Sequence, residues 1–320
     1  MRRHVLRTNL SLLWMCLILI TTVGCMPLSP SSSANLTPFT NDGNMYSGGK
    51  WSPDGHWLAA SIFPGHTIQF FSPNGQVTST WQSGCDLGGL DNNFSWVADG
   101  RMSCFLANEP PLLKLVELDR SGQIKKSTQI TVPIPSTQIV FDVAWNPHHF
   151  WLATITDGQP AGSSTLLYVS DLAGHRLIQP LLIDGLQLAW SPDGTTLAIV
   201  QRSGDVLLLT IRQTATGKLA IVKTRRLAAG TDYLQNVAWS PSGRWLVCRH
   251  ATYESEDYLF LLATDGSGKQ VKLTSSTTDG QLDYPAWSPD GKQLIVSRVS
   301  DGALLSLDIA TLLKQKGVQP

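Results

Sequence analysis

The chain has 320 residues, of which 42% are apolar and 15% are charged, an ordinary composition for a folded globular protein. Its 24 Lys and Arg residues balance 24 Asp and Glu residues, so no basic field would attract nucleic acid. Because the charges balance, we expect no nucleic-acid partner. The length suits one large all-β domain or two ordinary domains.

Residues 1–25 differ in composition from the rest of the chain. The basic start MRRHVLR precedes the apolar run LSLLWMCLILI, which is shorter than the roughly 20 residues of a spanning helix and is typical of a secretory signal. The run ends in TTVGC, which resembles a bacterial lipoprotein signal, although Thr22 stands where such signals usually carry Leu. The resemblance implies cleavage before Cys25 and acylation of Cys25, with palmitate as a label for the lipid. An uncleaved anchor and an ordinary signal cut nearby remain as alternatives.

Residues 26–33, rich in Pro and Ser, are typical of a flexible tether between a lipid and a folded domain. No second apolar run of spanning length follows them. We therefore expect a protein of the bacterial cell envelope, lipid-anchored to the outer side of the cytoplasmic membrane or to the periplasmic face of a membrane.

Three cysteines follow the expected lipidation site, and an odd number argues against a disulfide framework. Cys85 and Cys104 are the only pair close in sequence, and Cys248 stands far from both. Export permits disulfides. We nevertheless expect these side chains to serve as small buried apolar groups.

One phrase recurs six times along the chain. Its copies are KWSPDGHWLAAS, SWVADGRMSCFL, AWNPHHFWLATI, AWSPDGTTLAIV, AWSPSGRWLVCRH and AWSPDGKQLIVSRV. The shared tryptophans stand roughly 45–49 residues apart, which matches a propeller blade of four short strands; they are Trp51, Trp96, Trp145, Trp190, Trp239 and Trp287.

The chemistry of the phrase explains its recurrence. Ser-Pro-Asp-Gly is typical of a type I turn, so the tryptophan ends the first strand of a blade and the second strand starts after the turn. Ala precedes the tryptophan in four copies. Because neighbouring strand residues point to opposite faces, each blade shows a large indole on one face and a methyl group on the other. Stacked blades need that complement of large and small groups.

The two ends of the repeat region complement each other. Residues 34–43, ANLTPFTNDG, resemble residues 271–280, VKLTSSTTDG, which form an outer strand and the loop after it. The last copy lacks such an outer strand, and residues 310–320 form a tail with poor strand character. We predict an all-β, six-bladed β-propeller over residues 34–309, closed by an N-terminal strand that completes the last blade, with no substantial helix. The expected blades span about 46–82, 91–132, 139–180, 184–227, 233–273 and 283–309.

The phrase WSPDG with its DG turns resembles the TolB-type, WD40-like propeller repeat of exported bacterial proteins and of prolyl oligopeptidase propellers. The resemblance covers most of residues 34–309. It implies the propeller fold and says little about activity. The chain shows neither the separate N-terminal domain of TolB nor the hydrolase domain of the peptidases.

No catalytic signature is found in the sequence. It contains no G-x-S-x-G elbow, no H-E-x-x-H motif and no P-loop. His148 and His149 replace the usual Asp-Gly of a turn, so we expect an exposed turn there and no metal site. We also expect no cofactor.

The positions three residues before the tryptophans should face the central channel. They carry Asn93, Asp142, Gln187, Asn236 and Tyr284, and Asp283 adds a carboxylate beside them. These groups either line a water-filled channel or coordinate a small polar ligand or a cation.

A second candidate surface is the loop HATYESEDY, residues 250–258. Its acidic and aromatic residues suit a partner protein, with a solvated loop as the alternative; they are Tyr253, Glu254, Glu256 and Asp257. We expect a monomeric, non-enzymatic lipoprotein that binds a protein or cell-envelope component as a scaffold. The alternative is a propeller that binds a small ligand, or acts as an enzyme, at the polar channel mouth.

One pattern has no explanation in the sequence alone. Blades 1, 3 and 5 carry a second tryptophan six residues after the first, at Trp57, Trp151 and Trp245, where the other blades carry Met102, Thr196 and Gln293. Duplication of a two-blade unit and coincidence remain as explanations.

Overall fold

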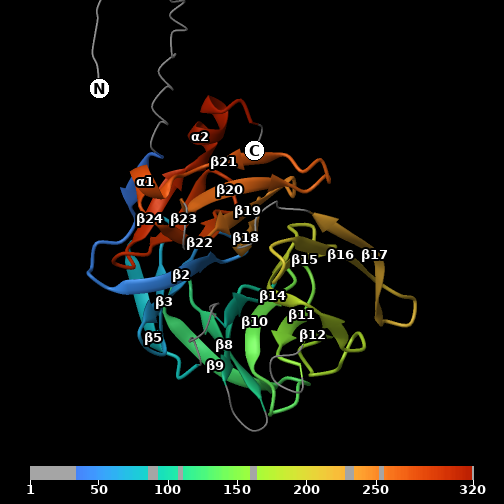
Figure 1. The fold of residues 1–320 in the computed structure, drawn as a ribbon. Coiled ribbons are helices and arrows are strands. Elements are labelled where there is room, and N and C mark those ends of the chain that lie inside the picture. The colour runs from blue at the N-terminus through green and yellow to red at the C-terminus, as the bar shows by residue number, and fades with distance from the viewer. Residues whose placement is uncertain are drawn as a thin grey trace, which may run out of the picture. The chain divides into compact units, whose positions relative to one another are not determined.

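The computed structural model describes residues 34–85, 93–106, 111–158, 164–227, 234–251 and 256–318. Within these ranges the strands form six four-stranded sheets, which confirms the predicted six-bladed β-propeller (Figure 1). Blades 1 to 3 consist of β2 (Met45–Trp51), β3 (Leu58–Phe63), β4 (Thr67–Phe71) and β5 (Val77–Gln82); β6 (Phe94–Trp96), β7 (Met102–Leu106), β8 (Leu112–Leu118) and β9 (Ile124–Thr131); and β10 (Val140–Trp145), β11 (Leu152–Thr156), β12 (Thr165–Ser170) and β13 (Leu181–Ile183).

Blades 4 and 5 repeat this order, and blade 6 takes its outer strand from the start of the chain. These blades consist of β14 (Gly185–Trp190), β15 (Thr196–Gln201), β16 (Val206–Gln213) and β17 (Leu219–Leu227); β18 (Leu234–Trp239), β19 (Trp245–His250), β20 (Tyr258–Ala263) and β21 (Gln270–Lys272); and β22 (Leu282–Trp287), β23 (Gln293–Arg298), β24 (Leu304–Asp308) and β1 (Leu36–Pro38). The inner strands β2, β6, β10, β14, β18 and β22 contact one another in that order, and β22 contacts β2. The ring of blades is therefore closed.

The turn after each inner strand forms as its sequence predicts. In blade 1, Gly55 N donates to Ser52 O at 2.9 Å, with Gly55 at a φ of +73°, a conformation that favours glycine. The Ser52 hydroxyl donates to Asp54 Oδ1 at 2.6 Å and accepts from Trp57 N at 3.0 Å. In blade 3 the side chain of Asn146 accepts from the backbone N–H groups of the exposed His148 and His149 instead, both at 3.0 Å.

The hydrophobic core lies between the blades. Among the described residues, the buried apolar side chains form six clusters, one at each junction of neighbouring blades. The repeated indole also ties its blade to the preceding one: Trp190 Nε1 donates to Ala144 O at 3.2 Å and Trp239 Nε1 to Ala189 O at 3.0 Å. The small side chains of Ala144 and Ala189 leave the next indole room to reach these carbonyls, which gives a packing reason for the Ala-Trp pair in the phrase.

The N-terminal strand closes the ring as predicted. β1 pairs antiparallel with β24, with Leu36 opposite Leu307 and Pro38 opposite Leu305. Figure 1 shows this blue segment beside the red C-terminal blade. The pairing continues through Phe39 N, which donates to Leu304 O at 2.9 Å. The Phe39 ring then packs edge-on against Phe71 of blade 1, at 5.9 Å between ring centroids. The strand therefore joins the last blade to the first.

Two short helices differ from the all-strand expectation. α1 (Ser276–Asp279) lies in the loop into blade 6, and α2 (Ile309–Gln315) follows the last strand. Ile309, Leu312 and Leu313 of α2 are buried in the core shared by blades 5 and 6. Asp308 caps α2 by accepting from Thr311 N at 2.9 Å. The tail is thus partly helical because its apolar residues recur at helical spacing. No helix in the described part of the chain has the length and hydrophobicity to cross a bilayer.

The expectation that Cys85 and Cys104 remain free apolar groups is wrong. They form a disulfide with 5.9 Å between their Cα atoms, and both are fully buried between blades 1 and 2. Cys248 is free and buried, as expected. The odd number of cysteines was misleading because one cysteine is a core residue and the other two pair.

Candidate functional site

A cavity of about 350 Å³ lies on the axis of the ring. Residues of all six inner strands line it, and the six repeated tryptophans are among them. Prolines of the turns that follow the inner strands add rigid apolar surface; they are Pro53, Pro147, Pro192 and Pro289. Its volume lies within the range of small-ligand sites, which is about 300–1,000 Å³. The central channel is therefore the candidate site that the sequence analysis proposed.

The structure places four of the six candidate channel residues in the lining of this cavity; they are Asp142, Gln187, Asn236 and Tyr284. Asp283 accepts hydrogen bonds from Asn236 and from Arg249. Asn93, which is 2% exposed, starts blade 2, and its Oδ1 atom has no hydrogen-bond partner among the described residues. Counting three residues back from each tryptophan therefore identified four residues that line the same cavity.

A bulge in the inner strands sets this level. In blades 1, 5 and 6 the pairing with the second strand shifts around Gly48, Asn236 and Tyr284. Their φ angles are 108°, 51° and 49°, in the left-handed region that glycine enters freely, Asn tolerates and Tyr adopts only under strain. Bulges re-aim side chains, and here they turn polar groups toward the neighbouring blade.

These polar groups bind one another across three blades. Gln187 Nε2 donates to Asn236 Oδ1 at 2.8 Å, and Gln187 Oε1 accepts from Asn236 N at 2.5 Å. Asn236 Nδ2 in turn donates to Asp283 Oδ1. Arg249 then donates to Asp283 Oδ2 at 2.5 Å and to Asp257 Oδ2 at 2.9 Å. This chain of hydrogen bonds links blades 4, 5 and 6, so these side chains use most of their hydrogen-bonding capacity inside the protein.

Sequence reasoning missed Arg249, the residue that joins two carboxylates. Its side chain is 12% exposed, and those of Asp257 and Asp283 are 4% and 14% exposed. Burial raises the pKa of the Asp283 carboxyl, and the Arg249 guanidinium opposes that rise. The only signal in the sequence was a charged residue inside an otherwise apolar second strand, VCRH.

Asp142 stands apart from this chain and ties blades 3 and 4. The carboxylate is 4% exposed and accepts from Val143 N and from Leu188 N, both at 2.8 Å. Lys50 Nζ of blade 1 lies 4.0 Å from Asp142 Oδ1. Burial raises the pKa of the Asp142 carboxyl, and the Lys50 ammonium opposes that rise. The channel lining thus combines apolar indoles with an oppositely charged pair.

The candidate partner-binding loop is only partly described, because Tyr253 and Glu254 lie outside the described residues. Glu256 accepts from Lys272 Nζ at 2.5 Å, and this hydrogen bond lowers the pKa of the Glu256 carboxyl. Asp257 belongs to the buried chain around Arg249 and presents little surface. The described part of this loop therefore serves the fold.

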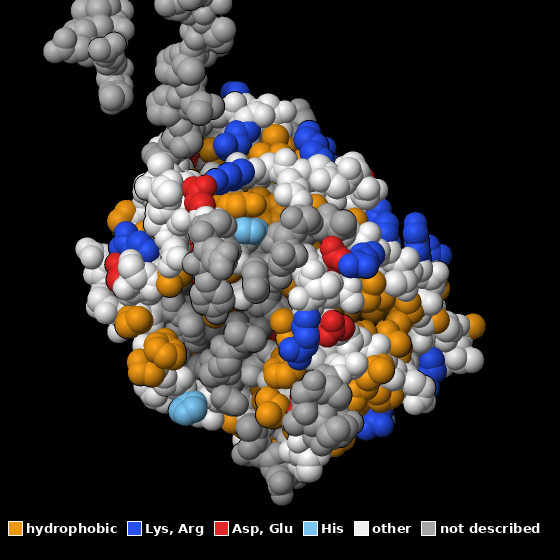
Figure 2. Space-filling model, viewed as in Figure 1, with side chains coloured by type: hydrophobic (Ala, Val, Ile, Leu, Met, Phe, Trp, Pro, Cys, Tyr) orange, Lys and Arg blue, Asp and Glu red, His pale blue; other side chains and the backbone are white. Residues whose placement is uncertain are grey.

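The described residues contain no group of three His, Cys, Asp or Glu side chains placed to hold a metal ion. Figure 2 shows Lys and Arg side chains scattered among apolar and acidic ones over the face viewed. The channel lining itself offers indoles, prolines and the Lys50–Asp142 pair.

Comparison with known proteins supports the fold. Residues 159–305 match the family model described as the Lipoprotein LpqB beta-propeller domain. The Protein TolB homolog of Chlorobium chlorochromatii (strain CaD3) is 36% identical over 153 residues, which cover 44% of this chain and 32% of that protein. The chain therefore matches about a third of the length of this curated relative.

Solved structures with low sequence identity share the fold alone. The β-propeller domain of Myceliophteria thermophila Cps50 (Swd1) is 12% identical with a TM-score of 0.60, covering 85% of this chain and 99% of that chain. The gluconolactonase XC5397 of Xanthomonas campestris is 15% identical with a TM-score of 0.59, covering 86% and 89%. TolB from Acinetobacter baumannii is 14% identical with a TM-score of 0.51, covering 82% and 62%. The chain is therefore a six-bladed β-propeller that is similar, over part of its length, to TolB and to the propeller domain of LpqB-type lipoproteins.

Proposed function

We propose that this protein is a cell-envelope lipoprotein, acylated at Cys25, whose propeller binds a protein partner at the mouth of its channel. One observation carries the proposal: the polar side chains in the channel already bind one another, while the turn prolines and the partly exposed Trp51 and Trp239 offer an apolar mouth. A small polar ligand that used Gln187, Asn236 or Asp283 would have to break the chain of hydrogen bonds from Gln187 to Asp257 in order to bind. An apolar segment of a protein would leave that chain intact.

The prolines at the mouth favour this mode of binding. Pro53 and Pro289 are exposed, and each follows the serine that starts its turn. Because proline fixes φ, the mouth loses little conformational entropy when a partner binds. Aromatic residues are also enriched in the cores of protein interfaces. The expected tether, residues 26–33, would keep this surface close to the membrane.

The alternative is a small-ligand or enzymatic site in the same cavity. The cavity volume of about 350 Å³ is compatible with a small ligand. A ligand of this kind would bind to Lys50 and Asp142 and would raise the melting temperature of the purified protein.

Photo-crosslinking in intact cells tests the proposal. A photo-reactive residue is placed at Pro289, and a control is placed at Leu182, which is 65% exposed on the outer strand of blade 3. We expect a specific protein to be captured from position 289 and not from position 182. P53E, made in the protein that carries the photo-reactive residue at position 289, should lose that capture while its melting temperature stays close to that of the parent protein, because Pro53 lies in an exposed turn.

Equal capture from both positions, or from neither, would overturn the proposal. Capture from position 289 that persists with P53E would do the same. A metabolite that stabilises the protein, without any captured protein, would establish the small-ligand alternative in its place.

A further inference from the structure

The alternating second tryptophan has a structural role. Trp57 packs against the core between blades 1 and 2, and Trp245 is buried in the core between blades 5 and 6. Trp151 lies between blades 3 and 4, with its ring 6.3 Å from that of Trp190. Each indole therefore fills the junction between its own blade and the next one.

The other junctions lack this filling side chain. Blade 2 has a turn one residue shorter, since Val97 N donates to Arg101 O where Ser52 N donates to Trp57 O. Arg101, and not Met102, therefore occupies the place of the second tryptophan in blade 2, which corrects the alignment made from the sequence. In blade 4 the equivalent residue is Thr196, whose backbone oxygen accepts from Ser191 N at 2.7 Å in the same way.

A cleft opens beside Thr196, between blades 4 and 5. Its volume is about 580 Å³, and Thr196 itself is part of the lining. Blade 5 contributes Trp239, Ser242 and Thr264 to the opposite wall. A threonine at the place of an indole is therefore accompanied by a cavity at the same junction.

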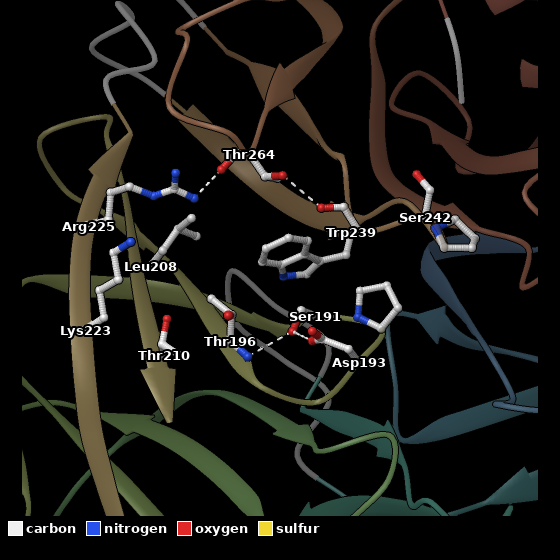
Figure 3. A pocket seen from close by; sticks show the side chains of 13 residues that line it. Ser191, Asp193, Thr196, Leu208, Thr210, Lys223, Arg225, Trp239, Ser242 and Thr264 are labelled. Carbon is white, nitrogen blue, oxygen red and sulfur yellow. Dashed lines mark hydrogen bonds between the residues drawn. The ribbon is translucent and has the colours of Figure 1, made fainter. Parts of the chain in front are cut away.

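The lining of this cleft divides into three kinds of groups. Lys223 and Arg225 come from β17 and form one wall, facing the Trp239 indole across the cleft (Figure 3). Hydroxyl groups complete the lining; they are Ser191, Thr196, Thr210, Ser242 and Thr264. The hydroxyls of Ser191 and Thr264 donate within the protein, to Asp193 Oδ1 and to Gly243 O. Asp193 lies beside Ser191, below Trp239 in Figure 3, and its Oδ1 atom accepts from Thr195 N at 3.0 Å within its own turn.

The two cations are available to a ligand to different degrees. Arg225 Nη2 donates to Thr264 O, which fixes the guanidinium in the cleft. Lys223 is exposed, and no described residue forms a hydrogen bond or an ion pair with its ammonium group. An anion would therefore meet one fixed planar cation and one mobile point charge, a combination suited to phosphate or carboxylate.

The remaining groups suit a sugar ring. An indole offers an apolar face to a ring, and hydroxyls exchange hydrogen bonds with a polyol as donors and as acceptors. Both carboxylate oxygens of Asp193 accept hydrogen bonds within its own turn, from Ser191 Oγ and from Thr195 Oγ1, so Asp193 is not assigned to the ligand.

We propose that the cleft between blades 4 and 5 binds a saccharide that carries a phosphate or carboxylate group. The anionic group binds Lys223 and Arg225, the sugar ring packs on Trp239, and the hydroxyls of the lining bind those of the sugar. This site adjoins the channel mouth, with which it shares Pro192 and Trp239, but its two cations belong to the cleft alone. If the protein lies in the cell envelope, as proposed above, such a ligand is an anionic sugar of the envelope glycans.

Calorimetric titration of the full chain with defined probes tests this. The probes are glucose 6-phosphate, an oligogalacturonate, glucose and inorganic phosphate. We expect saturable binding of at least one anionic sugar, and at least tenfold weaker binding of glucose and of inorganic phosphate. Which of the two anionic sugars binds more tightly distinguishes phosphate from carboxylate as the recognised group.

Three variants locate the site. T196W restores the side chain that blades 1, 3 and 5 carry, so it should fill the cleft and abolish binding. K223E reverses one charge at an exposed position and should weaken binding at least tenfold, whether or not T196W folds. K316E makes the same charge change at an exposed residue after α2 and should leave binding unchanged. Binding that survives T196W and K223E, or no saturable binding of either anionic sugar, would overturn the proposal.

Discussion

The tryptophan that ends each inner strand donates a hydrogen bond at some junctions and not at others, which provides a matched pair of variants. Trp190 Nε1 donates to Ala144 O at 3.2 Å, whereas Trp287 Nε1 has no hydrogen-bond partner among the described residues. Both side chains are 7% exposed. W190F and W287F therefore remove the same atoms from equivalent buried positions, and the difference between them reports the hydrogen bond.

The size of this difference follows from the two environments. W190F removes a hydrogen bond with a net contribution of about 0.5–1.5 kcal/mol and leaves a buried carbonyl without this donor. W287F removes a donor that is already unsatisfied. The long distance at Trp190 places its bond at the weaker end of the range. We therefore expect W190F to lower the free energy of unfolding by about 1 kcal/mol more than W287F, or about 2–4 °C in melting temperature.

Differential scanning calorimetry of the full chain, with urea unfolding as a second measurement, gives both values. The two variants should share the loss caused by the smaller ring, and W190F should show the additional loss. Equal unfolding free energies, or a larger loss in W287F, would refute the role assigned to the indole in joining blades.

Three further outcomes follow from the structure. F39A should lower the melting temperature by about 4–8 °C, because the half-buried ring joins the N-terminal strand to blade 1 and its loss costs about 2 kcal/mol. The control variant F150A, at a side chain that is 44% exposed, should change the melting temperature little. Equal effects of the two variants would argue against the closure. C25S should abolish metabolic labelling with palmitate, and labelling that persists would reject the predicted lipidation site. The hydrogen bond from the Ser288 hydroxyl lowers the pKa of the Asp290 carboxyl below its usual 3.8, so the stability that this carboxylate contributes is present above pH 3.8 and is lost as the pH falls through the lowered pKa. D290N should therefore flatten the acid limb of melting temperature against pH, and an unchanged limb would contradict this.

The repeat could be predicted because its signals are local. Ser-Pro-Asp-Gly encodes its own turn through Ser52 and Gly55, and the tryptophan before it marks the end of a strand. The closure could also be predicted, since residues 34–43 resemble an outer strand that one blade lacks. These features depend on a few neighbouring residues and on the period, and a single sequence contains both.

The features that the sequence did not reveal depend on contacts between blades. The position of Asn236 could be predicted from the period, but its bond to Asp283 and the role of Arg249 depend on how bulges turn side chains across a junction. The disulfide likewise joins the end of blade 1 to the second strand of blade 2. Helix α2 was missed because it has only seven residues and is stabilised by its packing on blades 5 and 6.

In a closed ring of equal blades, most of what repeats is required by the packing of the blades. Repeated indoles such as Trp190 donate to the backbone of a neighbouring blade, and turn residues such as Ser191 and Asp193 bind within their own turns, so these groups have little hydrogen-bonding capacity left for a polar ligand. Positions where the repeat changes are free of that requirement. Thr196 breaks the pattern of the second tryptophan, and the cleft of about 580 Å³ lies beside it. Departures from the repeat are therefore better guides to sites for polar ligands in this fold than the repeated residues themselves, and T196W tests that rule as well as the site.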